Sequence, residues 1–264
     1  MQIGLKIWSI NTDCASTIEQ IIREKLCDYI ELYIVPGTFY ETHEFWRSLP
    51  VPYILHAPTT LHGLNPARAE LADSNCRLYE EVEWFAADLG TETIILHPGI
   101  DGPLATSIAW LRGIARPGLL IENKPWWSLD RRVCVGATPI AIQYIMSQTG
   151  IGFCLDFGHA IKTAIALKLN ALDLIDRFLE LKPAIFHISD GNMLDMMDQH
   201  WSLGKGDFPF PLIFQRLLLF QPSKITVETE KEFPDFYDQF YRDIMFIRRQ
   251  FTNLECNPKL SDDI

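Results

Sequence analysis

Apolar residues along this chain gather in short runs, and stretches with a different, helical spacing separate most of these runs. The short runs predict β-strands at 3–8, 29–34, 52–57, 93–98, 118–123, 151–156, 184–189 and 224–229. Between them, apolar residues recur three and four positions apart, which predicts helices at 18–26, 67–89, 104–114, 139–146, 171–181, 210–220 and 236–247. The stretch 36–50 leaves room for only a short helix.

Strand and helix alternate from one end of the sequence to the other, without a linker or a low-complexity tract. Eight such units predict a (β/α)8 TIM barrel, with a doubly wound open sheet as the alternative. We therefore expect a single TIM-barrel domain over residues 1–264, whose polar tail 257–264 is frayed. In a barrel, side chains that carry chemistry stand at the C-terminal ends of the strands. Six candidates stand there, namely His56, His97, Glu122, Asp156, His187 and Glu228.

Composition limits the setting in which the protein works. No apolar run approaches the roughly 20 residues that cross a bilayer, and the N-terminus has no secretory pattern, so we expect a soluble, cytoplasmic protein. The six cysteines form no CxxC pair, which favours reduced thiols over a disulfide framework. The formal charge of −11 disfavours a nucleic-acid partner. Three bound divalent cations would reduce it to about −5, so the charge alone does not exclude DNA.

The histidines are distributed unevenly. Five of the seven fall at or just beyond predicted strand ends: His56, His97, His159, His187 and His200. Asp198 and His200 are two residues apart, so in an extended segment their side chains point the same way and can grip one object. Imidazoles with carboxylates suit zinc or manganese, and the lack of thiolates in the set disfavours a closed structural zinc site. The pattern therefore indicates an open, catalytic metal site.

These residues lie in motifs that resemble a known family. The order LHAP, LHPG, IENK, CLDFGHA, FHISD, DQHWSLGKGDF and TVETE is similar to the metal-binding motifs of the endonuclease IV type of apurinic/apyrimidinic endonucleases (family 2), within the xylose-isomerase-like TIM barrel superfamily. The resemblance covers the third to the eighth predicted strand. It implies two to three divalent metal ions, zinc first, with manganese or iron as alternatives.

The resemblance also implies roles for individual residues. One metal would be held by His56, His97 and Glu122. Glu122 would bridge to a second metal, whose other ligands would be Asp156, His187 and Glu228. The third metal would be held by His159, Asp198 and His200. Such a centre implies hydrolysis of a phosphoester, damaged DNA among the candidates, with Glu122 or Glu228 orienting the attacking water or taking its proton. Lys205, between two glycines, and Trp126 are the expected substrate contacts.

Two alternatives remain open from the sequence. The stretch after the second strand has Arg47 as its only basic residue, and no basic stripe indicates a DNA track. A sugar or sugar-phosphate isomerase or epimerase of the same superfamily would use Glu122, Asp156, His187 and Glu228 around one metal. It does not require His56, His97, Asp198 or His200, which favours the hydrolase. A barrel that keeps its metal without catalysis is the third possibility.

Overall fold

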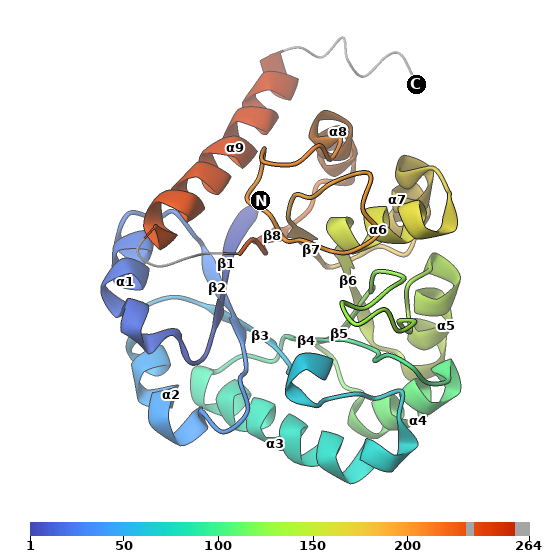
Figure 1. The fold of residues 1–264 in the computed structure, drawn as a ribbon. Coiled ribbons are helices and arrows are strands. Elements are labelled where there is room, and N and C mark those ends of the chain that lie inside the picture. The colour runs from blue at the N-terminus through green and yellow to red at the C-terminus, as the bar shows by residue number, and fades with distance from the viewer. Residues whose placement is uncertain (231–234, 257–264) are drawn as a thin grey trace.

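Eight parallel strands close into a barrel in the computed structural model, which describes residues 1–230 and 235–256 (Figure 1). Each strand pairs with the next in the chain, and the first pairs with the last. The closed, parallel arrangement confirms the predicted (β/α)8 barrel and excludes the open sheet. The strands are β1 (Gln2–Trp8), β2 (Tyr29–Tyr33), β3 (Tyr53–His56), β4 (Ile94–Leu96), β5 (Leu119–Glu122), β6 (Gly152–Asp156), β7 (Ile185–Ile188) and β8 (Lys224–Val227).

The α-helices form a ring around the barrel (Figure 1). They are α1 (Ala15–Arg23), α2 (Phe39–Ser48), α3 (Ala72–Leu89), α4 (Leu104–Ile114), α5 (Pro139–Thr149), α6 (Phe157–Leu167), α7 (Ala171–Leu179), α8 (Phe210–Phe220) and α9 (Phe236–Cys256). Short 3-10 turns stand at Asn11–Cys14, Thr60–His62 and Ala69–Leu71. Within the described ranges, no helix is both long and apolar enough to cross a membrane. The tail 257–264, for which we predict fraying, lies outside the described residues.

Helix α6 is the element that the sequence pattern did not predict. It begins directly after Asp156, whose side chain accepts a hydrogen bond from the backbone N–H of His159 and so caps the helix. Every residue from Phe157 to Ala164 is buried, so the helix has no polar face to produce an amphipathic signal. His159, which we placed just beyond a predicted strand end, therefore lies in the first turn of a buried helix.

The strand interiors form two layers that explain the position of the candidate site. Side chains on a strand alternate between faces, so residues two apart share the barrel interior. The lower layer is an apolar floor of Tyr29, Ile54, Ile95, Leu120, Cys154 and Ile185. Two residues further along the same strands stand Glu31, His56, His97, Glu122, Asp156 and His187. A charged layer thus rests directly on an apolar one, at the C-terminal end of the barrel.

Gly4 makes room for this floor. A Cβ at Gly4 would lie 2.3 Å from ring atoms of Tyr29, so only glycine lets that ring cross the barrel. The Tyr29 hydroxyl shares a hydrogen bond of 2.9 Å with Thr226 Oγ1. Lys6, two residues after Gly4, is then carried into the charged layer.

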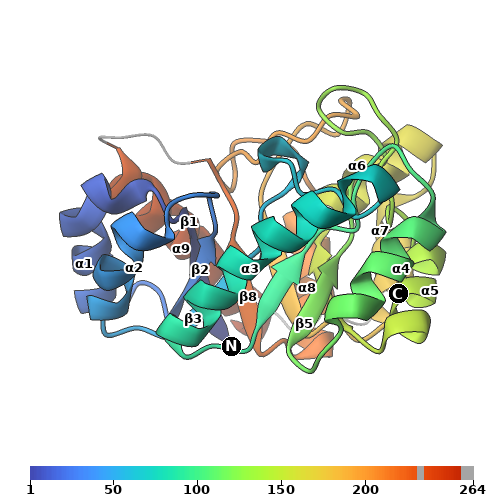
Figure 2. The same cartoon turned by 90° about the horizontal axis from the view of Figure 1, so that it is seen from below.

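The loop between β7 and α8, residues 189–209, carries Asp198 and His200. Figure 2 shows this orange loop rising on the same side as the green loop after β5, away from the N-terminus. Lys162 of α6, whose side chain is fully buried, donates hydrogen bonds to the carbonyls of Asn192 (2.8 Å) and Asp195 (3.0 Å). The helix that carries His159 therefore also holds the loop that carries its predicted partners.

Asp190 explains the two glycines around Lys205. Its buried carboxylate accepts hydrogen bonds of 2.8 Å from the backbone N–H groups of Gly191, Gly204 and Gly206. A Cβ at Gly206 would stand 2.1 Å from the carbonyl oxygen of Gly191. The amides of the two glycines beside Lys205 therefore bind Asp190 and hold the loop in place.

Replacing Asp190 by alanine should destabilise the protein by about 3 kcal/mol, since several buried N–H groups lose their acceptor at once. Urea unfolding at constant m-value measures the change. Asp207→Ala is the matched control, because the exposed Asp207 in the same loop accepts one such bond, from Met193. Equal losses in the two variants would contradict the role assigned to Asp190.

Candidate metal centre

The structure brings all nine predicted ligands together, five of them in the charged layer and the other four beside or above it. His56, Glu122 and Asp156 end their strands, His187 lies within β7, and His97 and Glu228 directly follow theirs. Their ligand atoms form three groups, and the atoms within each group lie within 4.8 Å of one another. The groups are His56, His97 and Glu122 (group one), Glu122, Asp156, His187 and Glu228 (group two), and His159, Asp198 and His200 (group three).

Glu122 is the hub of this cluster. Its Oε2 lies 3.0 Å from His56 Nε2, 3.2 Å from His97 Nε2 and 3.4 Å from His187 Nδ1. Its Oε1 lies 3.1 Å from His159 Nδ1, in group three. Burial acts to raise the pKa of this carboxyl, but the surrounding imidazoles hold it well below its usual range. One buried carboxylate therefore contacts a histidine from each of the three groups.

Hydrogen bonds to the main chain orient three of the imidazoles. In each, Nδ1 donates to a carbonyl oxygen, so that Nε2 faces the cluster and can bind an ion once it has lost its proton. The pairs are His56 with Ala57 (2.8 Å), His159 with Asn123 (2.7 Å) and His200 with Glu228 (2.9 Å). A neutral imidazole in this tautomer is suited to bind a metal ion through Nε2.

His187 is oriented the other way, by Glu31. Its Nε2 donates to Glu31 Oε2 at 2.9 Å, and that oxygen also accepts from Thr226 Oγ1 at 2.7 Å. Nδ1 of His187 then faces Glu228 Oε2 at 2.6 Å, inside group two. A carboxylate behind a histidine in this way raises the basicity of a metal ligand. Glu31 was not among the residues predicted from the sequence. A charged residue in the otherwise apolar and aromatic run YIELY was the feature that could have indicated it.

Lys6 is a second residue that the sequence did not single out. Its Nζ donates to Glu228 Oε1 at 2.6 Å and lies 3.3 Å from Glu31 Oε1. Burial acts to lower the pKa of Lys6, but these two carboxylates outweigh it and raise the pKa. The charged ammonium therefore holds one oxygen of Glu228 and leaves the other directed at group two.

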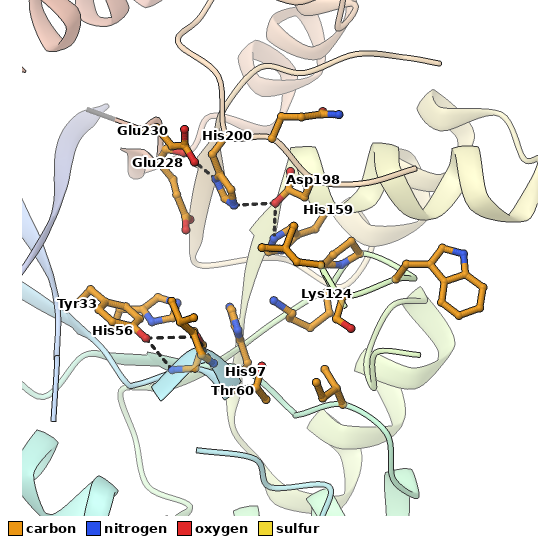
Figure 3. A pocket seen from close by; sticks show the side chains of 18 of the residues that line it. Tyr33, His56, Thr60, His97, Lys124, His159, Asp198, His200, Glu228 and Glu230 are labelled. Carbon is orange, nitrogen blue, oxygen red and sulfur yellow. Dashed lines mark hydrogen bonds and ion pairs between the residues drawn. The ribbon is translucent and has the colours of Figure 1, made fainter. Parts of the chain in front are cut away.

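Asp198 and His200 do converge, but not through an extended segment. Asp198 Oδ2 lies 2.6 Å from His200 Nε2 and 3.2 Å from His159 Nε2 (Figure 3). His200 has a φ of 47°, which only a few per cent of non-glycine residues adopt. Paired backbone hydrogen bonds of 2.9 Å between Asp190 and Trp201 hold the chain next to it. Such strain at a non-glycine residue is characteristic of functional sites.

The cluster contains buried polar atoms that make no hydrogen bond to any residue that the structure describes, although several of them face an opposite charge at short range, as His187 Nδ1 faces Glu228 Oε2. They are His97 Nε2, Glu122 Oε1, Asp156 Oδ2, His187 Nδ1, Asp198 Oδ1 and Glu228 Oε2, along with Glu31 Oε1. A buried polar atom without a partner destabilises a protein unless something else binds it. Oxygen and imidazole atoms that face one another across a few ångströms form a donor set that fits divalent cations. The residues present therefore fit the predicted ions.

When no metal ion is bound, protons on Asp156 and His200 reduce the negative charge of the ligand cluster. Burial, together with repulsion from Glu228 and Glu122, raises the pKa of Asp156 to about 6. Burial lowers the pKa of His200, but Asp198 beside it more than offsets this and raises the pKa to about 9. A metal ion must therefore displace protons from these ligands.

A cavity of about 830 Å³ opens above the cluster. His56, His97, His159, Asp198, His200 and Glu228 line it, and Figure 3 shows their side chains around the opening. Glu122, Asp156 and His187 are not among the lining residues, since they lie buried beneath it. Its walls include the rings of Trp8, Tyr33, Trp127 and Trp201. A substrate in the cavity therefore meets Glu228 but not Glu122.

The two predicted substrate contacts lie elsewhere. Lys205 is exposed and does not line the cavity. Trp126 lines a separate pocket of about 350 Å³, beside Cys134. Lys124 and Trp127, from the same loop as Trp126, line the main cavity instead. Lys124 and Trp127 stand in the motif IENKPWW, but the sequence did not show which side chains of this motif face the main cavity.

Comparisons with known proteins agree on the fold. A family model described as xylose isomerase-like TIM barrel matches residues 28–239. No curated protein matches the chain by sequence. A D-tagatose 3-epimerase-like protein shares 20% identity at a TM-score of 0.77, over 98% of this chain and 100% of that one. Endonuclease IV from Thermus thermophilus shares 20% identity at a TM-score of 0.67, over 96% of this chain and 100% of that one.

A third solved structure carries metal information in its description. The TTHB071 protein, also from Thermus thermophilus and soaked with ZnCl2, shares 18% identity at a TM-score of 0.68, over 95% of this chain and 98% of that one. All three likenesses are at low identity and show the fold alone. Because they include both an endonuclease and an epimerase-like protein, they do not indicate which reaction this protein catalyses. The resemblance to the endonuclease IV type in particular is therefore not confirmed.

Replacing His200 by alanine should remove about one metal ion per chain, because group three keeps only two of its ligands. Elemental analysis of the purified protein measures the metal content. His43→Ala is the control, since His43 lies on α2, paired with Asp88 at 3.0 Å, outside the three groups. An unchanged metal content in His200→Ala would refute the assignment of group three.

Metal affinity should rise between pH 6 and pH 9, because His200, with a pKa of about 9, must lose its proton to bind an ion. The expected change is about tenfold per pH unit for each proton displaced. Zinc titrations against a competing chelator at pH 6, 7 and 8 measure it. His200→Ala should flatten the dependence, and an affinity independent of pH in the unaltered protein would contradict the prediction.

Proposed function

The chain belongs to the xylose isomerase-like TIM barrel family, and we propose that it is a metal-dependent phosphoester hydrolase with a trinuclear divalent-metal site. The observation that carries the proposal is the presence of groups one and three beside group two. A single-metal isomerase needs only the four residues of group two. The other five side chains are His56, His97, His159, Asp198 and His200.

These additional side chains are costly to bury without a ligand. His56 and His159 are almost inaccessible to solvent, and one oxygen of the Asp198 carboxylate accepts no hydrogen bond from the part of the chain that the structure describes. Such a set is stabilised when cations bind it. Three cations at one rim suit a reaction whose substrate and transition state carry negative charge, as in phosphoester hydrolysis.

The protein's own residues divide the remaining work. Divalent ions at the three groups would acidify a water and neutralise charge on phosphoryl and leaving oxygens. Glu228 lines the cavity with 16% of its side chain exposed, so it can orient the attacking water and accept its proton. Lys6 holds the other oxygen of Glu228 and thereby fixes the carboxylate. Glu122, which is fully buried below and belongs to both group one and group two, would hold ions rather than act as a base.

The second candidate is a sugar or sugar-phosphate epimerase that uses group two alone. The likeness in fold to the D-tagatose 3-epimerase-like protein favours it. Proton exchange at a sugar carbon requires two bases that both reach the substrate. Glu228 faces the cavity, but Glu122 does not line it. The geometry therefore supports the hydrolase better.

Metal-loaded protein should cleave bis(p-nitrophenyl) phosphate and leave ketoses unchanged, in parallel assays of p-nitrophenol release and sugar composition. Glu228→Gln should lower kcat by about 100-fold or more, because the proton acceptor is lost. Metal content is measured alongside, since Glu228 is also a ligand. Glu80→Gln, on the exposed face of α3, is the control. Ketose epimerisation with one ion per chain and no phosphoester cleavage would reject the hydrolase in favour of the epimerase.

A further inference from the structure

Three lysine or arginine side chains line the cavity, and they differ in their ion pairs. Lys6 donates to Glu228, and Arg132 donates to Asp130 at 2.7 Å. Lys124 lines the same cavity, and across residues 1–230 and 235–256 its ammonium group makes neither a hydrogen bond nor an ion pair. It is the one cavity cation, within these ranges, whose charge no side chain neutralises.

The backbone of Lys124 is held on both sides. Its N–H donates to the carbonyl of Gly136, and its own carbonyl accepts from Thr163 Oγ1, each at 3.3 Å. Figure 3 shows its side chain directed into the cavity between His97 and His159. These histidines belong to groups one and three. The fixed backbone thus places a cation between two ligand groups.

An ammonium facing two sites for cations is repelled when those sites are filled. Its position becomes favourable when an anion lies between them, because the anion is attracted by the ammonium and by the ions. A phosphate has the required charge and several acceptor oxygens. We infer that Lys124 binds the phosphate of the substrate, and that this substrate is a small phosphoester with a ring in its organic part.

The size and the charge of the cavity favour a small substrate over duplex DNA. Its volume of about 830 Å³ is within the range of sites for small ligands, roughly 300–1,000 Å³. Binding to duplex DNA depends on many phosphate contacts from lysine and arginine. In this cavity the other lysine or arginine side chains, Lys6 and Arg132, are already paired with carboxylates, and the formal charge of the chain is −11.

Aromatic walls explain the preference for a ring. The rings of Trp8 and Tyr33 lie 5.2 Å apart and are tilted against each other, and both line the cavity, as do Trp127 and Trp201. Aromatic side chains offer flat apolar surfaces on which a base, a sugar or an aryl group can pack. This inference rests on the proposed phosphoester hydrolysis and names the substrate class of the same site.

Binding of inorganic phosphate to the metal-loaded protein tests Lys124 without relying on catalysis. Lys124→Met should weaken binding about tenfold or more in calorimetry, and Lys124→Arg should retain most of it. Lys224→Met is the matched control, since Lys224 begins β8 at the opposite end of the barrel. Metal content and melting temperature, measured on every variant, show whether the centre and the fold are intact. Equal phosphate affinity in Lys124→Met and the unaltered protein would overturn the inference.

Kinetics with two substrates test the substrate class. The ratio kcat/KM should be higher for thymidine 5′-(p-nitrophenyl phosphate) than for an abasic duplex, and Lys124→Met should raise KM for the small substrate about tenfold with kcat little changed. A preference for the duplex, or an unchanged KM, refutes the inference while leaving phosphoester hydrolysis standing. Lys124-dependent phosphate binding without cleavage of either substrate refutes the proposed function and supports the anion site.

Discussion

The buried carboxylate of Glu122 is the constraint on which the site depends. It has no exposure to solvent and contacts His56, His97, His159 and His187, so its charge requires positive partners at short range. Without metal these partners include the imidazoles of His159 and His187, whose pKa is raised well above its usual value by neighbouring acidic groups, and with metal they would be cations. The cluster is therefore a set of groups whose protonation and metal content are coupled, rather than a collection of independent hydrogen bonds.

Residues behind the ligands give this cluster its shape. Main-chain carbonyls orient His56, His159 and His200, and Glu31 orients His187. Asp190 and Lys162 hold the loop that brings Asp198 to His159. These ligands converge because contacts outside the set of ligand atoms position them. Changes at these supporting residues are expected to act on the metal centre from a distance.

The fold does not distinguish between the reactions found on similar barrels, so hydrolysis is proposed from the depths at which the two glutamates lie in the site. Glu228 reaches the cavity and Glu122 lies below it, which gives a substrate access to one glutamate. Lys124 adds a positive charge between groups one and three, where a phosphate is attracted and a neutral sugar gains little. Both observations concern side-chain positions that differ among proteins with the same backbone.

The barrel could be predicted from the amino-acid order because the alternation of strands and helices is a local pattern. The nine candidate ligands followed from acids and histidines at or just beyond strand ends, together with the resemblance of their motifs to a known family. The sequence did not reveal α6, which is buried on all sides and lacks a polar face, nor Glu31 and Lys6, whose role arises from a neighbour across the barrel. Only the tertiary structure showed that Lys205 points outward and Lys124 inward. The direction of a loop side chain is decided by contacts such as those of Asp190, between residues far apart in the chain.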